Sequence, residues 1–525
     1  MRTLPNDKPF LPNHTTFALV FTALYGVALA FFMQYHELWF DETEPWLLAL
    51  YSNSYTDLLT NKQFEGHPNL WYSLLYVITR FTDNLQALKI TQWACALGFV
   101  FVFLRNAPFP RVTKLLICFG YYGLFEYGLI SRLYAIELLT LFLICTFYPK
   151  RFTHWYGYVL LLILNAQTNL FGFLMSGVLG LLLLSEAFKI WKESPHWAPI
   201  STSQKIMGGF LWALGCGFSF WSMLRPVEPH KEFFPLTMPY YFFQSGTRLW
   251  QAFVPIPSFI VNFWNTSLLN NSKEIVLSGV LFLVIAGGLL GVKRLLYLFL
   301  LLFATLFFFF YLKFEGSLRH HAHYFIFTLA FYWIASFYQK EEHSSYPLLL
   351  QRFHLWTKKW FAKLLLVCAV LQVAAGVYAL YIEVKYPFFP GKQVAEYLKT
   401  LPSHAIIVTE DEVTSSNITA YYGQPIFHLP NGNYRSFYVL NFLEDHNPRK
   451  FVLLDWAGAI AQQRQAPVIY ISRNEIPYQW HTTPVILLKE YKGNYINTFS
   501  FFIYEIPPLP IPKKQITAEP PVGGL

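Results

Sequence analysis

The chain has 525 residues, of which 54% are hydrophobic and only 13% are charged. A soluble domain carries about 25% charged residues, so this composition excludes a soluble protein along most of the chain and predicts an integral membrane protein. The net charge of +9 does not indicate nucleic-acid binding, because Lys and Arg are scattered singly between apolar runs instead of forming a basic segment.

About eleven apolar segments approach the roughly 20 residues that a helix needs to cross a bilayer core. The first segment continues into His-Glu-Leu-Trp instead of a small-residue cleavage site, so we expect a retained helix and not a signal peptide. Residues 155–188 form either one helix or two, since polar side chains interrupt them near Asn165 and Asn169. The five cysteines lie within apolar runs without metal-ligand spacing. The predicted helices are 15–34, 87–104, 113–130, 133–148, 155–169, 170–188, 206–223, 274–290, 295–312, 321–338 and 361–382.

The distribution of Lys and Arg predicts the orientation of these helices. Alternate short loops carry most of the positive charge, whereas the long connections 35–86 and 225–273 are sparser in it. The positive-inside rule therefore places the N-terminus in the cytoplasm and both long connections outside. With eleven helices the C-terminus also lies outside, in a multi-pass protein of the cell (inner) membrane.

The composition changes near Tyr386, because Pro387, Pro390 and Gly391 end the last apolar helix. Short apolar runs then alternate with helical patterns, which predicts a small α/β domain with a largely parallel sheet. No Gly-rich fingerprint follows the first run, so dinucleotide binding is not indicated. The runs are 405–408, 467–471, 484–488 and 499–504, and the helical patterns are 392–401, 415–422 and 451–463. We expect a transmembrane domain over 1–385, an extracytoplasmic α/β domain over 386–506 and a Pro-rich tail over 507–525.

The most informative stretch follows the first predicted helix, where Asp41, Glu42 and Glu44 lie between Trp39 and Trp46. Repulsion between neighbouring carboxylates, together with the low dielectric beside indole rings, favours a carboxylate that accepts a proton. This pattern is typical of a general base. The alternative is a hydrated loop with interfacial Trp anchors.

Two more clusters lie on the same predicted side of the membrane. Glu65 and His67 present a carboxylate and an imidazole together, unless His67 is only an interfacial residue. The stretch Ser-Arg132-Leu-Tyr134 joins two predicted helices on the outer side, against the charge trend. An arginine there indicates a bound anion such as a phosphate, and the alternative is a side chain that extends to the membrane surface.

A fourth cluster combines Arg319 with His320, His321 and His323, again on the predicted outer side. Such a cluster favours a phosphate site, although His320 and His323, about one helical turn apart, could instead bind a metal. The apolar segments contain almost no charge, whereas a transporter places ionisable residues near the bilayer midplane. The four clusters therefore favour chemistry at the membrane surface over transport.

Taken together, these motifs resemble those of the GT-C membrane glycosyltransferases, which include protein O-mannosyltransferases and the bacterial aminoarabinose transferase of lipid A. The resemblance extends over nearly the whole chain, and its most specific element is the Asp-Glu pair. The similar stretches are Trp-Phe-Asp-Glu at 39–42, Glu-Gly-His-Pro at 65–68, Ser-Arg-Leu-Tyr at 131–134, Leu-Arg-His-His at 318–321 and the entry into the soluble domain at 389–398.

The resemblance implies an inverting transfer of a sugar from a polyprenyl phosphate to an extracytoplasmic hydroxyl of a lipid, a glycan or a protein. It implies Asp41 as the catalytic base, with Glu42 orienting the acceptor. The cationic groups for the donor phosphate are then Arg132, Arg319 and His320. The further substrate-binding residues are Glu65, His67, Tyr134 and His321. No cofactor is assigned and a divalent metal stays open, as does the alternative of a non-catalytic membrane protein that binds or transports a lipid-linked glycan.

Overall fold

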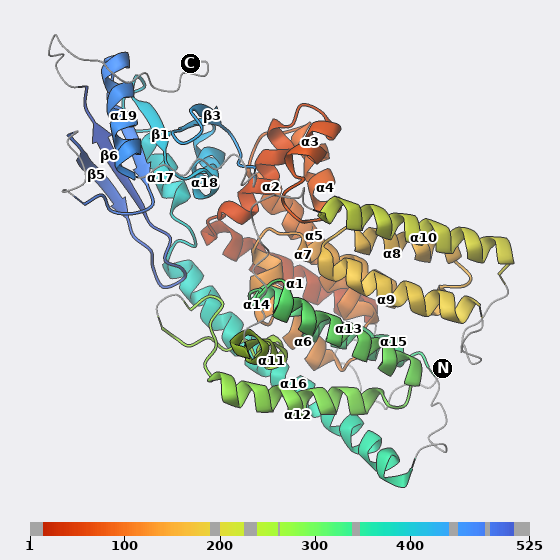
Figure 1. Cartoon of the computed structure of the whole chain (residues 1–525). Coiled ribbons are helices and arrows are strands. Elements are labelled where there is room, and N and C mark those ends of the chain that lie inside the picture. Colours follow the sequence, from red (N-terminus) through yellow and green to blue (C-terminus); the bar gives the residue numbers. More distant parts are fainter. Residues whose placement is uncertain are drawn as a thin grey trace.

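The chain is a multi-span helical membrane protein with a C-terminal domain built on a mixed sheet. The computed structural model describes residues 14–188, 200–224, 239–260, 263–338, 347–439, 450–477 and 484–508. In Figure 1 the long helix α16 (Leu348–Lys385) runs along the helical region and leads at its C-terminal end into the α/β domain.

Seven helices of the described residues are long and apolar enough to cross a membrane, or up to eight if the bent pair is counted as one span. The bent pair is Arg111–Leu129 with Tyr134–Lys150, whose axes differ by 119°. The prediction of about eleven spans exceeds this count of seven or eight candidates, although every predicted segment is helical. Besides α16, the candidate spans are α1 (His14–Tyr35), α5 (Gln86–Asn106), α9 (Leu170–Ala187), α10 (Thr202–Met223), α12 (Asn271–Leu289) and α13 (Lys293–Leu312).

The difference comes from two short helices and from the bent pair, which the sequence predicts as two spans. α8 (Trp155–Ala166) has 12 residues and α15 (His323–Ala335) has 13. At about 1.5 Å per residue each covers roughly 20 Å, less than the roughly 30 Å of a bilayer core. The polar break in 155–188 does separate two helices, because the Asn169 side chain caps α9 by accepting a hydrogen bond from Gly172 N at 2.7 Å.

The bent pair contains a π-helix, a rare form that often marks functional sites. It consists of α6 (Arg111–Cys118), the π-helix η1 (Tyr121–Leu129) and α7 (Tyr134–Phe147), which continues into η2 (Tyr148–Lys150). Only glycine fits at position 123, since a Cβ there would lie 2.3 Å from a backbone oxygen. The residues between η1 and α7 include Arg132, which the bend turns toward the segment that follows α1.

That segment, residues 35–86, is called the first connection and is largely helical. It contains α2 (Phe40–Tyr51), α3 (Tyr55–Asn61) and α4 (Leu70–Thr79). α2 begins directly after Trp39. The Glu42 carboxylate, in the first turn of the helix, accepts the Trp39 N–H at 3.0 Å, which is one of the two hydrogen bonds of a capping box. The second long connection contains α11 (Pro239–Phe253), and α14 (Leu318–His321) precedes α15.

The C-terminal domain has a six-stranded sheet in the order β3-β2-β1-β4-β6-β5. β1 pairs in parallel with β2 and β4, whereas the other three pairings are antiparallel. The prediction of a largely parallel sheet is therefore wrong, because β3 folds back on β2 and β6 runs opposite to both of its neighbours. The elements are α17 (Gly391–Leu398), β1 (Ile406–Thr409), α18 (Glu412–Tyr422), β2 (Ile426–His428), β3 (Asn433–Arg435), α19 (Lys450–Arg464), β4 (Val468–Ser472), β5 (Ile486–Tyr491) and β6 (Phe501–Ile506). The predicted tail lies outside the described residues from 509 onward.

Helix α18 of this domain packs on the first connection (Figure 1). The Asn417 amide donates to Leu38 O at 2.8 Å, and Leu38 N donates to the Tyr421 hydroxyl at 2.8 Å. Tyr438 N donates to a carboxylate oxygen of Glu44 at 3.1 Å. The domain therefore lies at the C-terminal end of α1, on the same side of the membrane as the first connection.

We expect a reporter that is active only outside the cytoplasm to be active when fused after Leu525. The charge asymmetry predicts this orientation, and the contacts between α18 and the first connection require both segments to share it. The same reporter inserted after Lys192, in a connection predicted to be cytoplasmic, should be inactive. A fusion after Leu525 that is intact but inactive would show that the whole chain has the opposite orientation.

Candidate active site

Asp41 lies between two arginines that come from distant parts of the sequence. Its Oδ2 atom is 3.2 Å from Arg319 Nη2 and 3.8 Å from Arg132 Nη1. Arg132 also donates to the backbone oxygen of Asp41. The Asp41 side chain is 22% exposed and those of Arg319 and Arg132 are 14% and 9% exposed. The arrangement therefore holds two nearly buried cations beside a carboxylate that solvent or a substrate can reach.

Aromatic rings fix the guanidinium of Arg319. It lies 5.1 Å from the ring centroid of Trp39 and 5.4 Å from that of Trp264. The backbone of the same residue is also held, because the Tyr127 hydroxyl donates to Arg319 O at 2.5 Å. Such cation–π contacts orient a cation in a site with little water. This cation is therefore preorganised to meet an anion.

The neighbouring carboxylate, Glu42, has a different environment. It is fully buried, and its oxygens lie 3.0 Å from His36 Nε2 and 2.5 Å from the donating Ser131 N–H. It also accepts the Trp39 N–H described above. Glu42 therefore connects the end of α1, the start of α2 and the bend before α7, and its oxygens are occupied by the protein itself.

His36 is held between Glu42 and Glu383, whose oxygen lies 2.9 Å from His36 Nδ1. Burial alone would lower the pKa of His36, but the two carboxylates raise it to about 9. The imidazolium is therefore the stable form at neutral pH. This buried group connects the first connection to α16 and keeps the backbone on either side of Asp41 in place.

We expect the stability that His36 contributes to depend on pH. Its folded pKa lies above the ordinary value of 6.5, so the contribution is complete below pH 6.5 and is lost as the pH rises toward 9. The upper limit is about 3 kcal/mol. Thermal unfolding of the parent and of His36→Gln should therefore differ most near pH 6 and least above pH 9. A difference that stays constant over this range would show that His36 is not charged.

The third carboxylate of the motif, Glu44, faces the C-terminal domain. Burial raises the pKa of Glu44 well above its usual range, and Glu65 raises it further. Its hydrogen bond from Tyr438 N and its complete burial give it a packing role. Of the three carboxylates in the motif, Asp41 is therefore the one that reaches the open part of the site.

His320 lies next to Arg319 in the sequence and is a neutral imidazole. Burial lowers the pKa of His320 well below 6.5, and Arg319 lowers it further. Its Nδ1 accepts the Ser317 N–H at 2.9 Å, so the ring proton is on Nε2. The ring also lies edge-on to Tyr134, with centroids 6.2 Å apart. His320 can therefore donate one hydrogen bond without adding charge.

The other two histidines of the cluster at 319–323 form hydrogen bonds away from Asp41. His321 Nε2 donates to Glu315 O at 3.0 Å, and its ring packs against Phe310. His323 has both ring nitrogens engaged, with His320 O at 2.8 Å and with Glu137 at 2.9 Å. His323 is therefore not available as a metal ligand. Over the described residues, no group of three or more His, Cys, Asp or Glu side chains is arranged to hold a metal ion.

Glu65 and His67 lie at the edge of the same site. The Tyr72 hydroxyl donates to Glu65 at 3.3 Å, and Glu65 is close enough to Arg132 to interact with it electrostatically. His67 is within electrostatic range of His320, and its backbone oxygen accepts from Lys62 Nζ at 2.8 Å. The structure thus brings most of the predicted cluster residues together near Asp41, whereas His321, His323 and Glu44 contact other parts of the protein.

Comparisons with known proteins identify no relative. No protein-family model matches the chain, and neither the curated proteins nor the solved structures gave a match. The geometry of this site and the resemblance of its motifs are therefore the observations that bear on function.

Sequence reasoning missed two residues that complete the site. Glu126, in η1, accepts hydrogen bonds from the Tyr121 hydroxyl at 3.0 Å and from Trp264 Nε1 at 3.1 Å. It thereby holds the indole that packs on Arg319. A carboxylate within the apolar segment 113–130 was the available signal for Glu126, whereas no local pattern marks Trp264.

Proposed function

We propose that this protein is an inverting glycosyltransferase of the GT-C type, which moves a sugar from a polyprenyl phosphate to a hydroxyl of a lipid, glycan or protein. One observation carries the proposal: a reachable carboxylate, Asp41, lies between the two arginines Arg319 and Arg132, shortly after the candidate span α1. The resemblance of the motifs that contain these residues to those of that family also supports it.

The chemistry follows from these positions. Asp41 accepts the proton of the acceptor hydroxyl as the hydroxyl oxygen attacks the anomeric carbon. The bond between that carbon and the donor phosphate oxygen breaks, and its electron pair leaves with the phosphate. Because attack and departure occur on opposite faces of the sugar, the anomeric configuration inverts.

The departing phosphate gains negative charge, which fixed cations stabilise in a nearly dry site. Arg319 and Arg132 supply this charge, and the Nε2–H of His320 adds a neutral donor. Glu42 is a positioning residue in this proposal, because its oxygens are bonded to His36 and to backbone N–H groups. It acts by holding the backbone of Asp41.

The second candidate function, a protein that binds or transports lipid-linked glycans without chemistry, needs the arginines but not the carboxylate. A phosphate-binding protein gains nothing from a carboxylate 3.2 Å from its main cation, since that carboxylate competes with the ligand. The position of Asp41 therefore favours the enzyme.

Mass spectrometry of the lipid that co-purifies with the full-length protein tests the donor class. We expect a polyprenyl phosphate, with or without a sugar, in the parent and a much lower amount in Arg319→Ala. Only bulk phospholipids in both preparations, at equal amounts, would contradict a polyprenyl-phosphate donor.

A further inference from the structure

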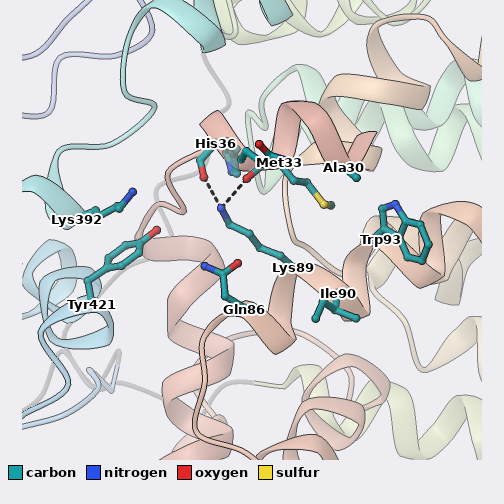
Figure 2. A pocket seen from close by; sticks show the side chains of 10 residues that line it. Ala30, Met33, His36, Gln86, Lys89, Ile90, Trp93, Lys392 and Tyr421 are labelled. Carbon is teal, nitrogen blue, oxygen red and sulfur yellow. Dashed lines mark hydrogen bonds between the residues drawn. The ribbon is translucent and has the colours of Figure 1, made fainter. Parts of the chain in front are cut away.

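A second site lies where the first connection begins, and its lining includes His36 but not Asp41. It is a cavity of about 440 Å³ between the C-terminal end of α1 and the N-terminal end of α5, bordered by α17 and α18 of the C-terminal domain. We call it the interfacial cavity. Figure 2 shows its lining, with polar groups toward the C-terminal domain and apolar groups along the two membrane helices.

The polar end is built around Lys89. Its ammonium group donates to Met33 O at 2.9 Å and to His36 O at 2.6 Å, which leaves the third of its N–H groups for another acceptor. The ammonium of Lys392, the Tyr421 hydroxyl and the Gln86 amide are directed toward Lys89 in Figure 2. Two cations that are close enough to interact electrostatically therefore line this end of the cavity together with two neutral polar groups.

Carboxyl groups also lie near these lysines: Glu37 is 3.9 Å from Lys392 Nζ, and Lys89 interacts electrostatically with Glu42, Glu383 and Glu37. Burial raises the pKa of Glu37 to about 7, although Lys392 opposes the change. A carboxyl group whose pKa is raised repels an anion less than an ordinary Glu does, and its protonated form donates a hydrogen bond to an anion.

The other end of the cavity is apolar. Ala30 lies on α1 and Ile90 and Trp93 lie on α5, each further from the C-terminal domain than the polar residues of the same helix. Ile90 is 64% exposed on a helix apolar enough to span the membrane, so this side opens toward lipid. Trp93 is anchored by a hydrogen bond to Gly26 O at 2.9 Å.

We infer that the interfacial cavity binds one phospholipid, with its phosphate between Lys89 and Lys392 and an acyl chain along Ile90 and Trp93. The order of polar and apolar groups along α1 and α5 matches the order of headgroup and chain in a leaflet. A soluble phosphate would use only the polar end, and the apolar end is what selects a lipid. This inference does not depend on the proposed glycosyltransferase activity.

The site is separate from the pair of arginines but is connected to Asp41, which pairs with them, through His36 and Glu42. Lys89 holds the backbone oxygen of His36, and the ring of His36 holds Glu42, the neighbour of Asp41. A phosphate that accepts a hydrogen bond from Lys89 therefore contacts a residue that holds His36 in place, but it does not enter the candidate active site.

Native mass spectrometry of the full-length protein, titrated with phosphatidylglycerol, tests the inference. We expect one lipid to bind more tightly than all others and Lys392→Gln to weaken that binding about tenfold, since a charge-assisted contact is lost. Lys273→Gln, which removes an exposed lysine at the start of α12, is the matched control and should bind like the parent.

Two competitors separate the sources of the phosphate. Diacylglycerol, which has the chains but no phosphate, should not displace the bound lipid, and neither should millimolar inorganic phosphate. Displacement by diacylglycerol would show that the cavity does not recognise the phosphate, and displacement by inorganic phosphate that it does not need the chain. Equal lipid binding by the parent and Lys392→Gln would also overturn the inference.

Discussion

Replacing Asp41 by Asn is expected to lower the rate of sugar transfer by about 10²–10⁴-fold, the usual cost of losing a general base. The fold should persist, because the amide has nearly the shape of the carboxylate. Donor binding should be equal or tighter, since the carboxylate that now pairs with Arg319 at 3.2 Å would no longer compete with the phosphate. Transfer measured at saturating donor separates the two effects.

Glu42→Gln is the control for this variant. The amide keeps an oxygen for the backbone N–H groups but removes the negative charge beside His36. We therefore expect a less stable protein whose folded fraction transfers sugar at a rate much closer to the parent. If Glu42→Gln were inactive and Asp41→Asn mild, the two roles would be exchanged, and if both had the parent rate, the first connection would not be catalytic.

Replacing Arg319 by Ala is expected to weaken donor binding by about 10–150-fold, as for the loss of a hydrogen bond between charged groups. Arg319→Lys should weaken donor binding less than Arg319→Ala, because the positive charge remains. The paired N–H groups and the packing between Trp39 and Trp264 are lost in both variants. Binding of a labelled polyprenyl phosphate measures both variants.

Arg80→Ala is a matched control, because it also removes a guanidinium group, in this case from the first connection. The Arg80 guanidinium donates to backbone oxygens of α2 and of the residue after it, such as Ala49 O at 2.8 Å, whereas the arginines that pair with Asp41 are Arg319 and Arg132. It should therefore bind donor like the parent. Parent-like binding by Arg319→Ala itself would make this arginine a structural residue.

The candidate site was predictable where its residues lie in short motifs. Asp41, Arg132 and Arg319 each follow the end of an apolar segment, and helices that cross one membrane bring such ends to a common surface. The charge asymmetry alone therefore predicted that the clusters share a side. The separate environments of Asp41 and Glu42 were not predictable, since adjacent residues on a helix point about 100° apart and only tertiary contacts decide which of them is buried.

Contacts between residues that lie far apart in the sequence were not predictable either. The partner of His36 is Glu383, which lies near the end of α16, and no local pattern connects the two. In the C-terminal domain, β2 and β3 have three residues each, too few for an alternating pattern. The alternation of strands and helices predicted a mostly parallel sheet, but it does not show that β6 pairs antiparallel with both β4 and β5. Hydropathy likewise identified α8 and α15 as helices but could not distinguish a short buried helix from a span.

The most direct test of the proposed function uses a polyprenyl phosphate that carries a labelled sugar, added to membranes that contain the full-length chain or Asp41→Asn. We expect the parent to release polyprenyl phosphate and to move the label to an acceptor with inverted anomeric configuration, and the variant to bind the donor without transfer. Label that stays on the polyprenyl carrier with every donor sugar tested, although the parent binds the donor, would contradict the enzyme and favour a binding protein.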